Sequence, residues 1–380
     1  MSRSRAAGVL LLTLLAVALV VPATLSADDS GPADDLGSSG RSYRFYVCSE
    51  SEDEVALLRF GPGGLEVLKT ISVGSFPAEI EGPHGITVAP DGRYWYVTLA
   101  HGAPFGSLHK YRTGSDEWMG EVTIGMFPAT LAISRSTDFL YVVNFDLHGE
   151  RKPSSVSVIE PESLVEIARI ETGVMPHGSR MNAAGDRHYS VSMGQDQLIE
   201  VDALRFEVTR RLTLTALRSG ERGGAQHLER SIAPTWVTSP TSAGKVYVTG
   251  SAVDAIFEVD IDDWRQERVF GAGGSGPYNA EVAEAVGLLV VTYKGSSEVG
   301  FWDLESGREV ARAATSRSLP HGVVVTTDGL YSIVTVEGVG SEPGTVEVFD
   351  NRSYARVAAV DVGKQAGGIS LWDESLLPNE

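Results

Sequence analysis

Short runs of apolar and polar residues alternate along most of the chain, and they return in a fixed order. Each unit opens on a Pro and a short apolar run such as "GITVA" or "GVVVT", followed by a turn such as Asp91-Gly92 or Asp328-Gly329. An aromatic and β-branched run comes next ("YWYVT", "FLYVVN", "KVYVTG"), then an alternating run ending on an acid ("AIFEVD", "TVEVFD"), then a looser fourth run. Period-two runs of this length with Asp-Gly turns between them predict antiparallel β-strands.

The spacing of the units predicts a β-propeller. The anchor residues that open the units are Pro83, Pro128, Pro176, Pro234, Pro277, Pro320 and Ala366. Successive anchors are 45, 48, 58, 43, 43 and 46 residues apart. Four strands in a repeat of about 40–45 residues are typical of one propeller blade.

The two ends of the chain supply one further blade between them. Residues 43–74 read as strands two, three and four with no first strand before them, and residues 366–372 ("AGGISLW") read as a first strand with nothing after it. Pairing the two would close the ring and leave no free sheet edge. We therefore predict an all-β fold, a seven-bladed propeller of four-stranded antiparallel blades over 42–373, followed by a tail over 374–380.

The N-terminus has the pattern of an export signal. Arg3 and Arg5 precede the apolar run "GVLLLTLLAVALVV", and "PATLSA" then offers small residues for cleavage near Ala27. We expect a signal peptide over 1–27, a disordered acidic leader over 28–41 and a periplasmic or secreted protein. The 14 apolar residues are few for a membrane span, so a retained anchor is the alternative reading.

Charge and cysteine content narrow the choice of partners. The formal net charge of −19 argues against nucleic acid or an anionic membrane as a partner, and permits a basic substrate or a cationic protein.

The single cysteine, Cys48, excludes an internal disulfide. Because it falls inside the strand pattern "YRFYVCS", we expect a buried thiol rather than a nucleophile.

The repeat resembles a known family. The segments "PHGITVAPDGRYWYVT", "FPATLAISRSTDFLYVVN" and "SAGKVYVTG" are similar to the YVTN-type (WD40/YVTN-like) β-propeller repeat of exported bacterial and archaeal proteins, over roughly residues 42–373. The resemblance implies a seven-bladed propeller related to those of nitrous oxide reductase, the haem-containing nitrite reductase and bacterial lactonases. These relatives carry out different chemistry, so the fold alone does not assign a function.

A Pro-His-Gly triplet opens three of the units. Its histidines, His84, His177 and His321, belong to blades one, three and six, a nearly even spread around a seven-fold ring. We expect each to lie just before an innermost strand and to face the mouth of the central channel. Convergent neutral imidazoles could bind Zn, Cu or Fe. Alternatively, the histidine belongs to the repeat and only hydrogen-bonds a neighbouring segment, or the rings stay too far apart to share an ion.

The loops after the second strands, and the long insertion before Pro234, fall on the same face as the triplets. Loops on one side of a rigid ring commonly carry function. They contribute three further candidate metal ligands: His101, His148 and His227. Three other residues there are candidates for orienting a histidine, or are solvated loop residues: Asn144, Asp196 and Glu337.

Four residues near the channel mouth are candidate contacts for a small-molecule ligand: Arg180, Trp236, Tyr278 and Asn279. Aromatic rings suit an organic ligand and Arg180 suits an anion, whereas rim packing and a salt bridge are the alternatives. We expect His109 and His188, which fall in or next to strands away from this face, to be structural.

Motifs for other chemistries are missing from the sequence. There is no Gly-x-Ser-x-Gly elbow, no phosphate-binding loop before a helix and no Cys-x-x-Cys-His haem motif. Three functions stay open: an exported binding protein with an axial ligand site that could hold a metal, a propeller enzyme (a metal-assisted lactonase or lyase, or an oxidoreductase), and a protein-interaction scaffold. We favour the binding protein because acid and base candidates are scattered rather than paired.

Overall fold

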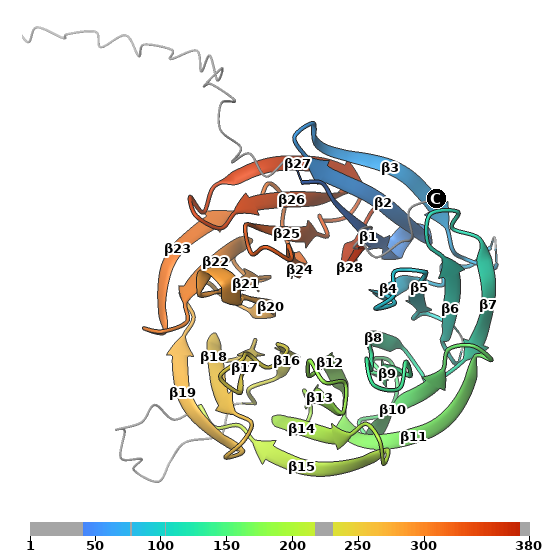
Figure 1. The fold of residues 1–380 in the computed structure, drawn as a ribbon, viewed down its shortest axis with the longest axis horizontal. Helices are drawn as coiled ribbons and strands as arrows, with labels where there is room; N and C mark the ends of the chain where they lie inside the picture. The colour runs from blue at the N-terminus through green and yellow to red at the C-terminus, as the bar shows by residue number, and fades with distance from the viewer. Residues whose placement is uncertain (1–40, 77, 103, 217–230, 373–380) are drawn as a thin grey trace, which may run out of the picture. The chain divides into compact units, whose positions relative to one another are not determined.

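The computed structural model describes residues 41–76, 78–102, 104–216 and 231–372, all within the compact unit Gly40–Glu380. The signal peptide, most of the leader, the tail and His227 fall outside these residues. Twenty-eight strands in the described part form seven four-stranded antiparallel sheets in a closed ring, the seven-bladed propeller that the repeats predict (Figure 1). No helix among these residues is long and apolar enough to cross a membrane.

Each blade runs outward from an innermost strand that begins at its anchor residue. In chain order from blade one, the innermost strands are β4 (Pro83–Val88), β8 (Pro128–Ile133), β12 (Pro176–Met181), β16 (Pro234–Val237), β20 (Pro277–Ala283), β24 (Pro320–Val325) and β28 (Ala366–Trp372). The second strands are β5 (Tyr94–Leu99), β9 (Leu140–Asn144), β13 (Arg187–Ser192), β17 (Lys245–Gly250), β21 (Leu288–Tyr293), β25 (Tyr331–Val336) and β1 (Tyr43–Ser49).

The outer half of each blade follows the same order. The third strands are β6 (Ser107–Arg112), β10 (Pro153–Glu160), β14 (Gln197–Asp202), β18 (Ala255–Asp260), β22 (Glu298–Asp303), β26 (Gly344–Asp350) and β2 (Glu54–Gly61). The outermost are β7 (Trp118–Thr123), β11 (Val165–Val174), β15 (Glu207–Thr213), β19 (Arg265–Gly271), β23 (Arg308–Ala314), β27 (Arg356–Val362) and β3 (Gly64–Ser72). Two 3₁₀ turns, η1 (Glu50–Glu52) and η2 (Glu284–Val286), complete the described elements.

The ring closes through the two ends of the chain. Strand β28 pairs antiparallel with β1, with Arg44 opposite Trp372 and Tyr46 opposite Ser370, so blade seven has the order β28-β1-β2-β3. Near this strand pair, a salt bridge of 2.9 Å between Lys364 and Glu52 also joins the two ends of the chain. Closure leaves β1 without an open edge, as the incomplete units at the two ends predict.

The apolar core lies between blades rather than at one centre. On β5, Trp95, Val97 and Leu99 pack toward blade seven, whereas Tyr96 packs toward blade two. Both faces of an inner strand are therefore buried, which is why these runs are almost wholly apolar. Cys48 on β1 is one of these core residues, and burial raises the pKa of its thiol, as expected for a structural cysteine.

The glycine of each triplet allows neighbouring innermost strands to approach closely. A methyl group at this position would meet a carbonyl oxygen of the next blade at 2.5 Å from Gly85 (Ala129), 2.6 Å from Gly178 (Thr235) and 2.8 Å from Gly322 (Gly367). Such distances are far inside van der Waals contact. Close packing of the seven innermost strands around the axis, which we call the hub, therefore explains the glycine. The histidine before it needs a separate explanation.

Candidate functional site

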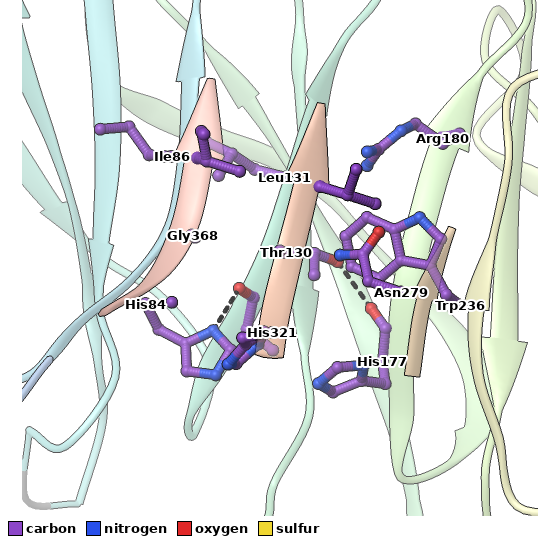
Figure 2. A pocket seen from close by; sticks show the side chains of 16 residues that line it. His84, Ile86, Thr130, Leu131, His177, Arg180, Trp236, Asn279, His321 and Gly368 are labelled. Atoms are coloured by element: carbon purple, nitrogen blue, oxygen red, sulfur yellow. Dashed lines mark hydrogen bonds between the residues drawn. The ribbon is translucent and has the colours of Figure 1, made fainter. Parts of the chain in front are cut away.

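The three triplet histidines meet on the propeller axis. Each is the second residue of an innermost strand (β4, β12 or β24), one step further into the strand than the sequence suggested. The imidazole centroids of His84 and His177 are 6.2 Å apart, and those of His84 and His321 are 5.6 Å apart. All three side chains are buried. Figure 2 shows them together at one end of an axial cavity.

Two of these histidines also tie one blade to the next. Nδ1 of His84 lies 2.8 Å from the carbonyl oxygen of Ala129, and Nδ1 of His177 lies 2.8 Å from that of Thr235. Each acceptor occupies the position of the triplet histidine in the following blade. The interpretation that the histidine hydrogen-bonds a neighbouring segment is therefore correct for these two, and it accounts for one ring nitrogen of each.

Threonines make the equivalent link at other blade junctions. Their hydroxyls donate to the same class of carbonyl: Thr130 to His177 (2.6 Å), Thr235 to Tyr278 (2.7 Å), Thr292 to His321 (2.9 Å) and Thr335 to Gly367 (2.6 Å). Hydrogen bonds to this carbonyl thus link the blades in succession from blade one to blade seven. At the junction of blades seven and one, the equivalent hydroxyl of Ser49 has no partner among the described residues. Since a threonine can make this bond, the inter-blade link alone does not require histidine.

His321 is held by a carboxylate instead. Its Nδ1 donates to Oε1 of Glu337 at 2.7 Å, and Nζ of Lys294 lies 2.6 Å from the same oxygen. Burial raises the pKa of Glu337, but His321 and Lys294 outweigh burial and bring it to about 2. Burial and the Lys294 charge lower the pKa of His321, so the ring is neutral at neutral pH. Glu337 is thus the orienting residue that the sequence placed among its candidates.

All three imidazoles consequently adopt the same tautomer. With Nδ1–H donating in each ring, the lone pair lies on Nε2. Nε2 of His177 accepts the hydroxyl of Tyr278 at 3.2 Å, and burial lowers the pKa of His177 to about 3. Within the described part of the chain, Nε2 of His84 and His321 has no hydrogen-bond partner. The three rings are therefore each fixed through Nδ1, and the lowered pKa values of His177 and His321 keep those two rings neutral with the lone pair on Nε2.

The aromatic ring of Tyr278 lies between two of the histidines. Its centroid is 5.6 Å from that of His177 and 4.8 Å from that of His321. Burial raises the pKa of its hydroxyl, which stays protonated and serves as a donor. Tyr278 therefore contacts two of the imidazoles directly, and its role as a contact for a small-molecule ligand stays a prediction.

A second group of histidines lies on the rim and is separate from the axial cluster. His101 and His148 have centroids 5.9 Å apart, and Phe127 packs between them and His84. Nε2 of His101 lies 2.7 Å from Oε1 of Glu50, which raises the pKa of that histidine. The structure therefore does not bring His101 or His148 to the three axial rings.

Glu50 is a site residue that the sequence analysis missed. Burial raises its pKa, but His84 and His101 outweigh burial and keep that pKa low, so a second carboxylate sits beside the cluster. It directly follows the second strand of blade seven, just as Glu337 follows that of blade six. Applying the same positional rule to the split blade would have found it.

The other two candidates for orienting a histidine have different roles. Asn144 binds the backbone amide of Gly125, and its amide group donates to Ser155 and Ser157. Asp196 accepts the backbone amides of Ile232 and Ala233. Asn144 thus links a loop to strand β10, and Asp196 fixes the start of blade four. Within the described residues, neither side chain hydrogen-bonds an imidazole, so neither orients a histidine.

A cavity of about 50 Å³ continues along the axis from the histidines, and all seven innermost strands line it. At its far end Arg180 stacks on the Trp236 ring at 4.4 Å and forms a 3.0 Å salt bridge with Glu281 (Figure 2). The salt-bridge alternative for Arg180 is thus correct. A wider space of about 540 Å³ follows, and it shares Arg180, Ile86 and Leu131 with the smaller cavity.

The described residues contain no group of three or more His, Cys, Asp or Glu side chains already arranged around one point as a metal ion requires. The imidazole rings of His84, His177 and His321 therefore lie near one another, but they are not already arranged as a metal-binding site. Binding of one ion by all three rings would require them to move inward and Tyr278 to be displaced from between His177 and His321.

Comparison with known proteins establishes the fold and no more. No protein-family model and no curated protein match the chain. The hydrazine synthase structure from Kuenenia stuttgartiensis is similar at 18% identity and a TM-score of 0.63, over 79% of this chain and 92% of that one. A structure described as a 6-phosphogluconolactonase from Bacteroides fragilis is similar at 13% identity and a TM-score of 0.68, over 89% and 100%. The β-propeller is supported, whereas the YVTN-type family is not established by these matches.

Proposed function

We propose that this chain is an exported β-propeller binding protein, of the YVTN-repeat kind, whose axial site binds one transition-metal ion through Nε2 of His84, His177 and His321. The observation that carries the proposal is the shared tautomer. Metal-binding histidines usually donate their other ring N–H to a carbonyl or carboxylate, which orients the ring and leaves the ligating lone pair in place. All three axial histidines do this, at 2.7–2.8 Å.

The charges around the cluster favour a cation. The carboxylates of Glu50 and Glu337 lie beside the rings, and both have lowered pKa values, so both are ionised at neutral pH. Lys294 offsets only one of them. Neutral imidazole with nearby carboxylate suits Zn, Cu and Fe, which are the ions we expect here.

Binding of one ion by all three histidines requires the rings to move inward and the Tyr278 ring to move out from between His177 and His321. Three imidazoles that share a tetrahedral ion at Zn–N distances of about 2.0–2.1 Å have ring centroids roughly 5 Å apart. The centroid of His84 lies 5.6 Å from that of His321 and 6.2 Å from that of His177, and the Tyr278 ring contacts both His177 and His321. An ion bound at Nε2 of His177 would replace the hydrogen bond that this nitrogen now accepts from the Tyr278 hydroxyl.

Metal content of the purified protein tests the proposal, with variants that separate the two ring nitrogens. Asparagine places an N–H near the Nδ1 position and has nothing at Nε2, so His84→Asn and His177→Asn keep the inter-blade donor and lose the ligand. His148→Ala is the matched control, because it removes an exposed imidazole from the same face. After incubation with Cu, Zn or Fe and desalting, we expect near-stoichiometric metal in the wild type and the control.

Loss of a group that only orients a ligand typically weakens metal binding about 10–100-fold, so loss of a ligand in the asparagine variants should weaken it by at least that much. The variants should unfold at the same temperature as the wild type. The proposal would be contradicted if the wild-type protein contained no metal after incubation with each of the three ions. It would also be contradicted if the asparagine variants retained the metal. In that case the imidazoles serve only to join blades, and the loop-rich face becomes the candidate site for a protein partner.

A further inference from the structure

The axial channel widens at the end opposite the histidines. The narrow cavity next to the imidazoles offers a ligand few contacts, because Oδ1 of Asn279 and Nε1 of Trp236 in its wall are fully buried. Beyond it, on the side of Arg180, lies the space of about 540 Å³, which is open to solvent and which we call the outer chamber (Figure 2). Small-molecule pockets measure roughly 300–1,000 Å³, so the outer chamber has the volume for an organic ligand.

Apolar side chains form most of the wall of the outer chamber. They belong to the second halves of the innermost strands, which end at this face of the ring. Ile133 on β8, Val324 on β24 and Leu371 on β28 are examples, and each is only partly buried. A molecule in the chamber can therefore contact them. Removal of this surface from water favours a ligand with an apolar part.

Blade four leaves a gap in this wall. Its innermost strand, β16, has four residues, whereas the other six innermost strands have six or seven. Among the described residues, none from blade four lines the outer chamber. A salt bridge of 3.0 Å between Arg180 on β12 and Glu281 on β20 spans this position. The charged pair therefore forms the part of the wall that the short strand leaves open.

The salt bridge is accessible and can form further hydrogen bonds. The side chains of Arg180 and Glu281 are 22% and 20% exposed. Of its five N–H donors, Arg180 uses one for Glu281 and one for the carbonyl oxygen of Ser179 at 3.1 Å. Within the described part of the chain, its other N–H groups and Oε1 of Glu281 have no hydrogen-bond partner. The Trp236 ring, 4.4 Å away, holds the guanidinium in place before a ligand arrives.

Two opposite charges in contact favour a ligand that also carries both charges. A simple anion bound to Arg180 would lie next to the Glu281 carboxylate, and a simple cation bound to Glu281 would lie next to the guanidinium. The third charged residue of the wall, Glu284, accepts a hydrogen bond from Ser242 at 2.8 Å and adds no positive charge. An α-amino acid carries its ammonium and carboxylate groups on one carbon atom, so both groups can meet the pair at once.

We propose that the outer chamber binds one α-amino acid with an apolar side chain. Its carboxylate accepts hydrogen bonds from the unused N–H groups of Arg180, and its ammonium group donates to Oε1 of Glu281. Its side chain lies against the apolar wall formed by the ends of β8, β24 and β28. The site is separate from the three histidines, and binding there does not depend on a metal ion.

Matched ligands test the proposal on the wild-type protein. L-phenylalanine and L-leucine are titrated against the purified protein, and saturable binding is measured by ligand-observed NMR. A chelator is present throughout, because amino acids also coordinate transition-metal ions and would otherwise report on the histidines. We expect both amino acids to bind. 3-Phenylpropionate lacks the ammonium group, phenethylamine lacks the carboxylate and glycine lacks the side chain, so each should bind at least about tenfold more weakly.

A pair of variants identifies the groups that bind. Glu281→Gln keeps a partner for Arg180 and removes the negative charge, so it should weaken phenylalanine binding about tenfold and strengthen the binding of 3-phenylpropionate. Glu298→Gln is the matched control, because Glu298 forms a similar salt bridge of 3.2 Å with Arg312 in the same blade but does not line the outer chamber. The control should bind phenylalanine as the wild type does.

The ligand series needs no variant, so it decides the question even if Glu281→Gln folds poorly. The proposal would be overturned if neither phenylalanine nor leucine showed saturable binding, or if 3-phenylpropionate or phenethylamine bound as tightly as phenylalanine. Equal phenylalanine affinities in folded Glu281→Gln and Glu298→Gln would overturn it as well.

Discussion

At the scale of single residues, Nδ1 of each axial histidine has a structural role, because it hydrogen-bonds a carbonyl of the next blade or the carboxylate of Glu337. The repeat spacing predicted that His84, His177 and His321 would converge, because equivalent positions in different blades face one axis. The tautomer was not predictable, since it depends on the carbonyls of Ala129 and Thr235 in the next blade. Every residue carries a backbone carbonyl, so the sequence does not show which one will accept the bond from the imidazole.

A buried histidine outside the site gives a pH-dependent prediction. His188 stacks on Tyr141 between blades two and three, neither of its ring nitrogens has a partner, and burial lowers its pKa to about 3. Because the folded-state pKa lies below the unfolded value of about 6.5, protonation favours the unfolded chain. The stability contribution is complete above about pH 6.5 and is lost as the pH falls toward 3.

Urea unfolding of the wild type and of His188→Phe, at about pH 7.5 and about pH 5, checks this prediction. Between the two pH values, the free energy of unfolding of the wild type should fall by about 2 kcal/mol more than that of the variant. The reason is that pH 5 lies about 1.5 units below the pKa of histidine in the unfolded chain. Equal losses in the two proteins would show that His188 does not titrate with unfolding.

At the scale of elements, strand order and turns were readable from the chain, and strand separation was not. The alternating runs and Asp-Gly turns located the inner strands, each beginning at its anchor residue. Nothing in the pattern indicated how closely β12 and β16 approach. A methyl group at Gly178 would lie 2.6 Å from both the carbonyl oxygen of Thr235 and Cα of Trp236. Backbone atoms of a neighbouring strand cannot move aside easily.

We therefore expect Gly178→Ala to lower the free energy of unfolding by about 2–3 kcal/mol. Gly63→Ala is the control, because a methyl group there meets nothing within 4 Å, and its effect should stay within about 0.5 kcal/mol. Denaturant titration of both variants measures the difference. Similar stabilities for the two would contradict the close packing of the hub.

At the scale of the whole molecule, closure of the ring is the feature that the sequence predicted most directly. Residues 43–74 lack a first strand and residues 366–372 lack the other three, so the period itself demanded that β28 pair with β1. The site was less accessible, because its cavity arises from all seven innermost strands together. The position of Glu50 could have been read from the repeat, whereas its hydrogen bond to His101 became visible only after these strands were placed around one axis.

A truncated chain tests closure. Ending the chain after residue 365 removes β28 and exposes the edge of β1, so we expect aggregation or a loss of cooperative unfolding, seen by size-exclusion chromatography and denaturant titration. A chain ending after residue 373 retains every described strand and should behave as the full-length protein does. A monomeric, cooperatively folded chain lacking β28 would contradict this account of the fold.

The most direct test of the central claim, that three imidazoles share one ion on the axis, is the hyperfine spectrum of a single bound Cu²⁺. One equivalent is added to chelator-treated protein, and nitrogen couplings are measured by electron paramagnetic and electron–nuclear double resonance. The account predicts couplings from three imidazoles in the wild type and from two in His84→Asn. Copper without imidazole nitrogen, or identical spectra from the wild type and the variant, would contradict it.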